Sequence, residues 1–273
     1  MKIFGIISFL VILISVAFFF FEKYNFDTWL EAGQKEITSH QVPTNKKPTA
    51  NLPPLLINYL KKVLVKVPAG SFVTFTQTGH FRMKPNDKLS PFSAKQYAST
   101  ISPMFSWIAN MTLNGLSVSV CDRLINNKGE LQARLFSAIT VAKGSGSNFL
   151  RGELLRYLAE LPWYPMAILS QPEIKWKSVS PNKITGTLSV NKVTATVEYR
   201  FDNNGLIQSI YVPNRERING DHVDLKPWLG EFSEYEEKNG ILIPVRGQVS
   251  WLLETGKFIY FDGRIDNYQI SGG

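Results

Sequence analysis

The sequence predicts an α+β protein of mainly antiparallel β-structure, in which a curved meander sheet or half-barrel is covered by helices and preceded by one transmembrane helix. Three observations predict this fold class. Residues 3–21 carry no charge, runs of aromatic and β-branched residues recur from Phe72 almost to the C-terminus, and short polar turn signals join these runs. Because short turns impose antiparallel neighbours and no strand alternates with a crossover helix, a parallel sheet is not expected.

The N-terminal apolar segment, residues 3–21, predicts a membrane anchor. As a helix it reaches about 28 Å, close to the hydrocarbon thickness of a bilayer. The alternative is a cleaved signal peptide, because Ser15-Val16-Ala17 offers small residues at the spacing that signal peptidase reads. The four phenylalanines from Phe18 to Phe21 continue the apolar run directly after this point, which favours an uncleaved anchor.

The charges on either side of this segment indicate its orientation. The amino terminus and Lys2 are positive, whereas acidic residues outnumber lysines between Glu22 and Glu36. The positive-inside rule therefore places the following domain outside the cytoplasm, in a single-pass protein of the cell membrane. A lipoprotein is excluded, since no cysteine follows the segment closely enough to accept lipid.

A change in composition separates the anchor from a folded domain. Pro43, the Lys46-Lys47-Pro48 triplet and scattered polar residues without sustained periodicity follow the apolar run. Such a stretch is typical of a stalk that holds a domain away from the bilayer. The expected division is an anchor at 1–22, a juxtamembrane stalk at 23–51 and a single β-rich domain at 52–273.

The domain begins with a predicted helix from Leu52 to Leu64. Apolar residues recur there at i, i+3, i+4 and i+7, and Pro53 and Pro54 suit the first turn of a helix. We expect it to pack over the sheet; a helix lying on the membrane is the alternative.

Strands are predicted wherever aromatic and β-branched residues dominate between turn signals. Asn126-Asn127-Lys128-Gly129, Asp202-Asn203-Asn204-Gly205 and Lys238-Asn239-Gly240 are such signals. The expected strands cover residues 72–83, 92–99, 104–112, 116–125, 130–142, 173–180, 183–190, 193–202, 205–212, 228–238, 241–253 and 257–270.

A helical insertion at about 147–169 interrupts the meander. Its main helix is predicted from Ser147 to Leu161, with Ser147 or Asn148 as N-cap and Pro162 just beyond its end. One face carries an apolar stripe. The adjoining face carries Glu153, Arg156 and Glu160, whose spacing lets them pair along the helix as solvated or interface ion pairs; a catalytic or ligand-binding row is the alternative.

The stretch from Arg151 to Pro165, which contains Gly-Glu-Leu-Leu-Arg-Tyr-Leu-Ala-Glu-Leu-Pro-Trp-Tyr-Pro, resembles the signature of a bacterial family of uncharacterised membrane-anchored proteins, a domain of unknown function. Further landmarks of that family follow in order over about residues 52–270. They are Leu52-Pro53-Pro54 with Tyr59-Leu60, Gln77-Thr78-Gly79, Phe201-Asp202 with Gly205, Trp228-Leu229-Gly230-Glu231-Phe232 with Tyr235, and Tyr260-Phe261-Asp262-Gly263-Arg264-Ile265. The resemblance implies no activity.

The order of elements also resembles, more loosely, the lipoprotein-carrier fold of the LolA and LppX kind, a strongly curved, incompletely closed sheet around helices. This resemblance implies a concave face that accepts acyl chains, and hence lipid or another apolar ligand as partner. The insertion would then gate that face. The candidate ligand-binding residues in it are Arg151, Glu153, Arg156, Tyr157, Glu160, Trp163 and Tyr164.

A second candidate site is the loop before the insertion helix. Lys143, Gly144, Gly146 and Ser147 could present backbone amides and a positive charge to an anion or a lipid headgroup. The loop lacks the Gly-Lys-Ser/Thr ending of a phosphate-binding loop, so a flexible loop with an N-cap is the favoured interpretation.

Composition excludes several other functions. The formal charge of +8 favours an anionic partner, but the lysines cluster before the domain and no dense basic helix follows, so nucleic acid is not expected. Cys121 is the single cysteine and His40, His80 and His222 are far apart, so neither a metal site nor a cofactor is predicted, and no catalytic residue is assigned. The oligomeric state does not follow from the sequence.

Three classes of function remain open. A membrane-tethered module that binds lipid or another apolar ligand at the cell envelope is favoured, and it requires a cavity on the order of 300 Å³ or more. A non-catalytic scaffold protein with a filled core is the first alternative. The second is a hydrolase that uses Glu153, Glu160 or Asp262, which requires convergent carboxylates and a raised pKa.

Overall fold

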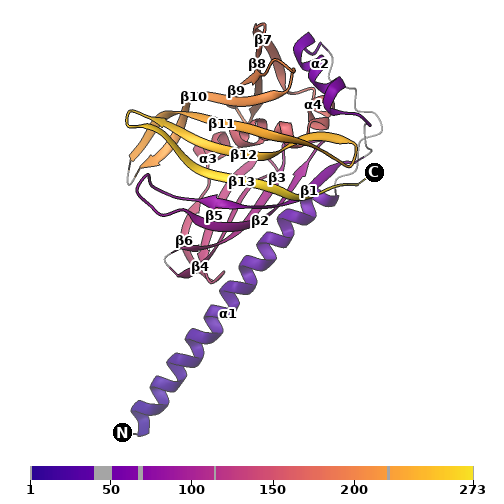
Figure 1. The fold of residues 1–273 in the computed structure, drawn as a ribbon. Coiled ribbons are helices and arrows are strands. Elements are labelled where there is room, and N and C mark those ends of the chain that lie inside the picture. The colour runs from indigo at the N-terminus through magenta and orange to yellow at the C-terminus, as the bar shows by residue number, and fades with distance from the viewer. Residues whose placement is uncertain (1, 40–50, 67–69, 114, 220–221, 273) are drawn as a thin grey trace.

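The structure is a computed structural model that describes residues 2–39, 51–66, 70–113, 115–219 and 222–272. A long N-terminal helix extends away from a domain built on one large sheet (Figure 1). The helices are α1 (Lys2–Ser39), α2 (Pro54–Val63), α3 (Ser147–Ala159), the 3-10 helix η1 (Leu161–Trp163) and α4 (Met166–Ser170). The strands are β1 (Phe72–Phe81), β2 (Ser90–Ser99), β3 (Phe105–Leu113), β4 (Leu116–Ile125), β5 (Lys128–Leu135), β6 (Ile139–Gly144), β7 (Lys175–Ser180), β8 (Lys183–Val190), β9 (Val193–Phe201), β10 (Ile207–Asn219), β11 (His222–Lys238), β12 (Ile241–Leu253) and β13 (Gly256–Ser271).

Two meanders make up the sheet, and all described neighbours are antiparallel. The strand order is β6-β5-β4-β3-β2-β1-β13-β12-β11-β10-β9-β8-β7. The first and last strands pair in the middle, with Phe75 opposite Tyr268, so each edge strand adjoins the helical insertion that connects β6 to β7. The predicted fold class, an antiparallel meander curved around helices, is confirmed.

The sheet is concave toward α3, because its strands bury alternate residues on that side and bend at irregularities of pairing. Along β9, Ala195, Val197 and Tyr199 are buried and their neighbours are more exposed. Register shifts in β1, β5, β7, β10 and β13 mark the bends. Helix α3 contacts both meanders, β4 and β5 on one side and β8, β9 and β10 on the other, so the core lies between this helix and the curved sheet.

The strand predicted at 130–142 is wrong as a single element. Strand β5 ends at Leu135 and β6 begins at Ile139, with Phe136 and Ser137 both at positive φ, 51° and 60°, in the turn between them. These are the angles of a type I′ hairpin turn, for which Asn and Gly are the usual residues. Phe-Ser gives no such signal, which explains the missed turn. The predicted strand 205–212 ends before β10 does, and the predicted strand 228–238 begins after β11 does, because β10 and β11 extend into a longer hairpin.

The predicted packing helix is α2. Pro53 precedes it and Pro54 occupies its first position, as expected from their fixed backbone angle. Leu56, Tyr59, Leu60 and Val63 are buried, and the Tyr59 ring meets Phe201 edge-on at 5.8 Å between centroids. The interpretation as a helix that covers the sheet is confirmed.

The stalk expected at 23–51 is not an extended linker over its first part. Helix α1 continues without a break from the apolar segment to Ser39, and its second half packs against the sheet. Phe26 and Ile37 are buried there. No periodic apolar stripe marks this part of the helix, because few of its residues are buried. The remainder of the expected stalk, residues 40–50 with His40 and the Lys46-Lys47 pair, lies outside the described residues.

Helix α1 lies on the face of the sheet opposite α3. Asp122 of β4 faces α3, so its neighbours Cys121 and Arg123 point to the other side. Arg123 donates from Nη1 to the Trp29 carbonyl at 2.9 Å, and its guanidinium lies 3.5 Å above the Trp29 ring. Gly33 allows the close approach, since a Cβ there would lie 3.1 Å from Arg123 Nη1. Strands β2 to β4 are therefore covered on both faces.

The insertion follows the prediction except at its start. Helix α3 begins at Ser147 as expected, but the N-cap is Gly146 with φ 98°, and no side chain of the described residues caps the helix. Helix α3 ends at Ala159, after which Pro162 lies in η1 and α4 completes the insertion at Ser170.

Candidate ligand-binding pocket

A partly open pocket of about 140 Å³ lies between α3, η1 and the concave face of the sheet. Its walls are mostly apolar, and a group of charged side chains lies on one side. Strands from both meanders contribute to it. The lining residues are Gln77, Phe81, Trp107, Asp122, Glu153, Arg156, Ala159, Glu160, Trp163, Ile210, Arg215, Trp228, Gly230, Phe232, Gly247, Gln248, Val249, Tyr260 and Phe261.

Arg156 is the centre of the charged group. Its Nη1 donates to Asp122 Oδ2 at 2.8 Å and its Nε donates to Glu160 Oε1 at 2.8 Å. Gln96 donates from Nε2 to the second Glu160 oxygen. The two carboxylates raise the pKa of Arg156 above its ordinary value in spite of the burial. One helix residue thus ties α3 to β4 and holds two acids at the pocket wall.

Indole and phenyl rings contact the two arginines of the pocket. The Arg156 guanidinium carbon lies 4.9 Å from the Trp107 ring centre, and that of Arg215 lies 4.1 Å from the Trp228 ring centre. Trp107 donates from Nε1 to Gln77 Oε1 at 2.9 Å, and Trp228 donates to the Tyr260 hydroxyl at 3.0 Å. These bonds fix the orientation of the rings, so the aromatic walls are preorganised.

Glu153 lies one turn before Arg156 on α3 and has a different environment from Glu160. Burial, and next the nearby Asp122 carboxylate, raise the pKa of Glu153 from 4.5 to about 8. Burial also raises the pKa of Asp122. Glu153 is therefore protonated at neutral pH, and it offers a hydroxyl donor to the pocket.

Four lining residues have buried polar atoms without a hydrogen-bond partner among the described residues. They are two nitrogens, Gln77 Nε2 and Arg215 Nη1, and two carboxyl oxygens, Asp122 Oδ1 and Glu153 Oε2. Because an unsatisfied buried polar group costs about 1–3 kcal/mol, such groups gather where water or a ligand completes them. The pocket is thus arranged to meet both acceptors and donors of a bound molecule.

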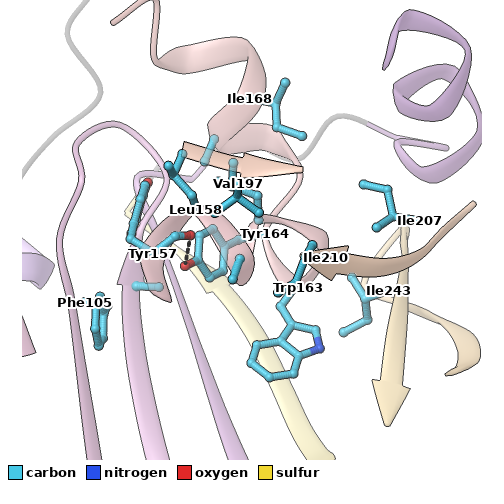
Figure 2. Close-up of a cluster of buried hydrophobic side chains, with 14 of the residues drawn as sticks. Phe105, Tyr157, Leu158, Trp163, Tyr164, Ile168, Val197, Ile207, Ile210 and Ile243 are labelled. Carbon is cyan, nitrogen blue, oxygen red and sulfur yellow. Dashed lines mark hydrogen bonds between the residues drawn. The ribbon is translucent and has the colours of Figure 1, made fainter. Parts of the chain in front are cut away.

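Six of the seven predicted ligand-binding residues fall into two groups. Glu153, Arg156, Glu160 and Trp163 line the pocket, whereas Tyr157 and Tyr164 lie behind it in the core. Figure 2 shows the Tyr164 hydroxyl bonded to the Tyr157 carbonyl, at 3.1 Å, with the Trp163 indole turned away from both rings. The tyrosines hold the insertion together and do not reach the pocket.

Arg151 lies at the surface and takes no part in the pocket. It forms an ion pair with Glu216 and donates from Nη2 to the Asn214 carbonyl at 3.0 Å. The side chain joins the start of α3 to β10, and a ligand contact of Arg151 stays a prediction.

The candidate anion loop lies apart from the pocket. Lys143 and Ser147 are exposed, and none of Lys143, Gly144, Gly146 and Ser147 is a lining residue. Gly144 is explained by packing, since a Cβ there would lie 1.9 Å from the Phe149 ring. Gly146 is explained by its positive φ.

Several pocket residues were not predicted. Asp122 and Arg215 complete the charged group, and Trp228 forms part of the aromatic wall. Gln77, Trp228 and Phe232 belong to the landmark segments quoted above, so a signal for them was present in the resemblance. Asp122 and Arg215 lie outside every motif, and only folding brings them to α3.

The pocket is smaller than the volume on the order of 300 Å³ at which pockets for drug-sized ligands begin. Its volume, about 140 Å³, resembles that of a cavity that admits a single small ring. Within the described ranges, no group of three or more His, Cys, Asp and Glu side chains is arranged to hold a metal ion.

The sequence matches the model of a family described as a family of unknown function (DUF6920) over residues 50–269. No curated protein matches it significantly. The resemblance drawn from the Arg151–Pro165 signature to a domain of unknown function is therefore confirmed.

Three solved structures have a similar arrangement of elements. A LolA superfamily protein from Nitrosomonas europaea is 10% identical, with a TM-score of 0.42 over 79% of this chain and 93% of that one. A DUF1329 family protein from Desulfovibrio piger is 12% identical, with a TM-score of 0.43 over 80% of this chain and 91% of that one. A structure from Vibrio parahaemolyticus, described as an outer membrane lipoprotein-sorting protein domain, is 8% identical. Its TM-score is 0.45 over 74% of this chain and 86% of that one. The similarity concerns the arrangement of elements alone.

Proposed function

We propose that this chain, which belongs to the DUF6920 family of unknown function, is a membrane-anchored domain that binds a small amphiphile in the pocket beneath α3. One observation carries the proposal. The pocket combines fixed aromatic walls with buried polar and charged side chains, four of whose atoms have no hydrogen-bond partner among the described residues. A purely apolar ligand would leave those atoms unsatisfied, so the ligand has a polar part and an apolar part.

The balance of charge defines the polar part. Arg156 and Arg215 carry two positive charges, Asp122 and Glu160 carry two negative charges, and Glu153 is neutral below its pKa of about 8. A group with a net charge would gain nothing from this balance and would lose its hydration. The polar part is therefore uncharged, such as a hydroxylated group, or zwitterionic.

The volume limits how much of the ligand enters. About 140 Å³ accommodates one small ring or a group of similar size, and the opening leaves room for the rest of the ligand to extend outward. The indoles of Trp107, Trp163 and Trp228 supply apolar contact on the walls.

Helix α1 supports the location of this activity at a membrane. It is long and apolar enough to cross a bilayer, and its residues from Ile6 to Phe18 are exposed. The charge asymmetry around it supports an extracytoplasmic domain on a single-pass anchor. A tether of this kind raises the effective concentration of a membrane-derived ligand at the pocket.

The test uses the full chain and a variant that fills the pocket. Wild-type protein in nanodiscs would be titrated with a phosphatidylcholine that carries short brominated chains, which quench nearby indoles. Ala159→Met extends a side chain into the pocket, and Ala142→Met makes the same change at an exposed position of β6. We expect saturable quenching in the wild type and in Ala142→Met that is lost in Ala159→Met. Equal quenching in all three, or none in a folded wild type, would refute the proposal.

Hydrolysis is the second candidate, because Glu153 has a pKa near neutrality and shares the pocket with two further carboxylates, Asp122 and Glu160. An acid of this kind is suited to donate a proton to a leaving group. If the domain is a hydrolase, bound ester or glycoside amphiphiles are cleaved by the wild type and persist intact with Glu153→Gln, which mass spectrometry of the bound fraction would show.

A further inference from the structure

The domain touches α1 at the level where the helix leaves its apolar span. Residues 3–21 fill about 28 Å, close to a bilayer's hydrocarbon thickness, and Glu22 is the first charged residue after them. Arg134 of β5 donates from Nη1 to Glu22 Oε2 at 3.0 Å and to the Glu22 carbonyl at 3.0 Å. With α1 in a membrane, the end of β5 therefore lies at the boundary between hydrocarbon and headgroups.

Exposed apolar side chains gather at that end of the sheet. The turn after β5 adjoins the turn before β4, since Phe136 N donates to the Ser117 carbonyl at 2.9 Å. Figure 1 shows the β4 and β6 ends beside the middle of α1, where the helix continues away from the domain. The exposed fractions at this place, here called the hairpin corner, are 46% for Leu116, 46% for Phe136, 52% for Ile139 and 57% for Val141.

We infer that the hairpin corner inserts its apolar side chains into the membrane surface next to α1. This inference rests on the proposed anchor and adds a second contact with the bilayer. Water is a poor environment for four large apolar side chains placed together, and the interfacial region accepts such groups. The occupant is a lipid surface because the neighbouring apolar surface is α1 itself, which is exposed from Ile6 to Phe18.

The second contact has a mechanical consequence. The packed half of α1, held by Phe26 and by the Arg123 contact with Trp29, fixes the helix to the sheet. Two contacts with the bilayer then restrict the tilt of the domain. The pocket keeps one orientation relative to the membrane instead of swinging on a flexible stalk.

The single buried cysteine makes a site-specific test practical. Cys121 is fully buried, so an introduced exposed cysteine takes up an environment-sensitive fluorophore selectively. The test variant is Ile139→Cys in the hairpin corner. The control is Val179→Cys on β7, which is 53% exposed and lies outside the corner. Each full chain would be reconstituted into vesicles of phosphatidylcholine and phosphatidylglycerol, with and without lipids that carry a nitroxide near the top of the acyl chain.

The expected result is a blue-shifted emission at position 139 and its loss with the nitroxide lipid, with neither effect at position 179. Flotation of the vesicles separates the two proposals. If the chain does not float, the anchor and the corner are both refuted. If it floats and the label at 139 behaves like that at 179, the corner alone is refuted. A blue shift that nitroxide lipid does not quench would place the corner against protein and would also refute the inference.

Discussion

Arg156 Nη1 lies 2.8 Å from Asp122 Oδ2, and this ion pair connects the insertion helix to β4 at the wall of the pocket. Among the described residues, the Arg156 side chain is the one cation that pairs with both Asp122 and Glu160, so it compensates two buried acids at once. The pair therefore matters to stability as well as to binding.

Arg156→Met should destabilise the domain by about 3–5 kcal/mol at pH 8, because it removes the cation that pairs directly with both Asp122 and Glu160 and leaves these acids buried. Urea unfolding of the full chain in detergent measures this change. The control is Arg246→Met, which removes an exposed pair with Asp262 at 2.9 Å and should cost about 1 kcal/mol or less. Equal losses in the two variants would contradict the compensating role of Arg156.

Glu153 makes stability depend on pH in a defined direction. Its pKa is 4.5 in the unfolded chain and about 8 in the folded protein. Between these two pH values the folded state therefore holds a proton on Glu153 that the unfolded state has released. The stabilising contribution of that proton is complete below pH 4.5 and is lost as the pH rises to about 8. As the pH rises from 4.5 to about 8, the free energy of unfolding should therefore fall less in Glu153→Gln than in the wild type. The difference between the two falls should be about a few kcal/mol.

Unfolding curves at several pH values test this, with Glu254→Gln at an exposed position as control. Parallel pH dependence of the wild type and Glu153→Gln would show that Glu153 ionises normally in the folded state.

The sheet could be predicted from the sequence because its signals are local. Alternating burial in β9 follows alternating side chains, and Asn126-Asn127 adopts the positive φ values expected of a hairpin turn. The Phe136-Ser137 turn could not be predicted, since its residues are unusual for that geometry and β5–β6 pairing imposes it. Local signals thus define strands but not every turn.

The site could be predicted in part for a similar reason. Glu153, Arg156 and Glu160 were found together because helical spacing places them on one face. Asp122 and Arg215 were not found, since they are 34 and 59 residues from Arg156 in the chain and meet it only through the curvature of the sheet. The packed half of α1 was not predicted, because its burial depends on distant residues, such as Arg123, and not on a periodic apolar stripe.

The packed half of α1 should behave as part of the domain. A fragment of residues 22–273 should be more stable than one of residues 45–273 by several kcal/mol, because burial of Phe26 and Ile37 contributes about 1.5–3 kcal/mol each.

Cys121 provides a second measurement of the packing of α1. Burial raises its pKa to about 12, and removal of the helix should expose the thiol and increase its reaction rate with a disulfide reagent. Unchanged stability and an unreactive thiol in the shorter fragment would contradict the packing of α1.

Gly144 distinguishes a packing role from anion binding in the loop before α3. A Cβ at this position would lie 1.9 Å from the Phe149 ring, so Gly144→Ala should force that ring to move and cost about 1–3 kcal/mol. In a Phe149→Ala background the same substitution should become nearly neutral, because the obstacle is gone. Gly152→Ala, with open space around its Cβ on α3, is the control and should stabilise the helix slightly. If Gly144→Ala instead left stability unchanged and weakened phosphate binding measured by titration, the glycine would be present for the approach of an anion.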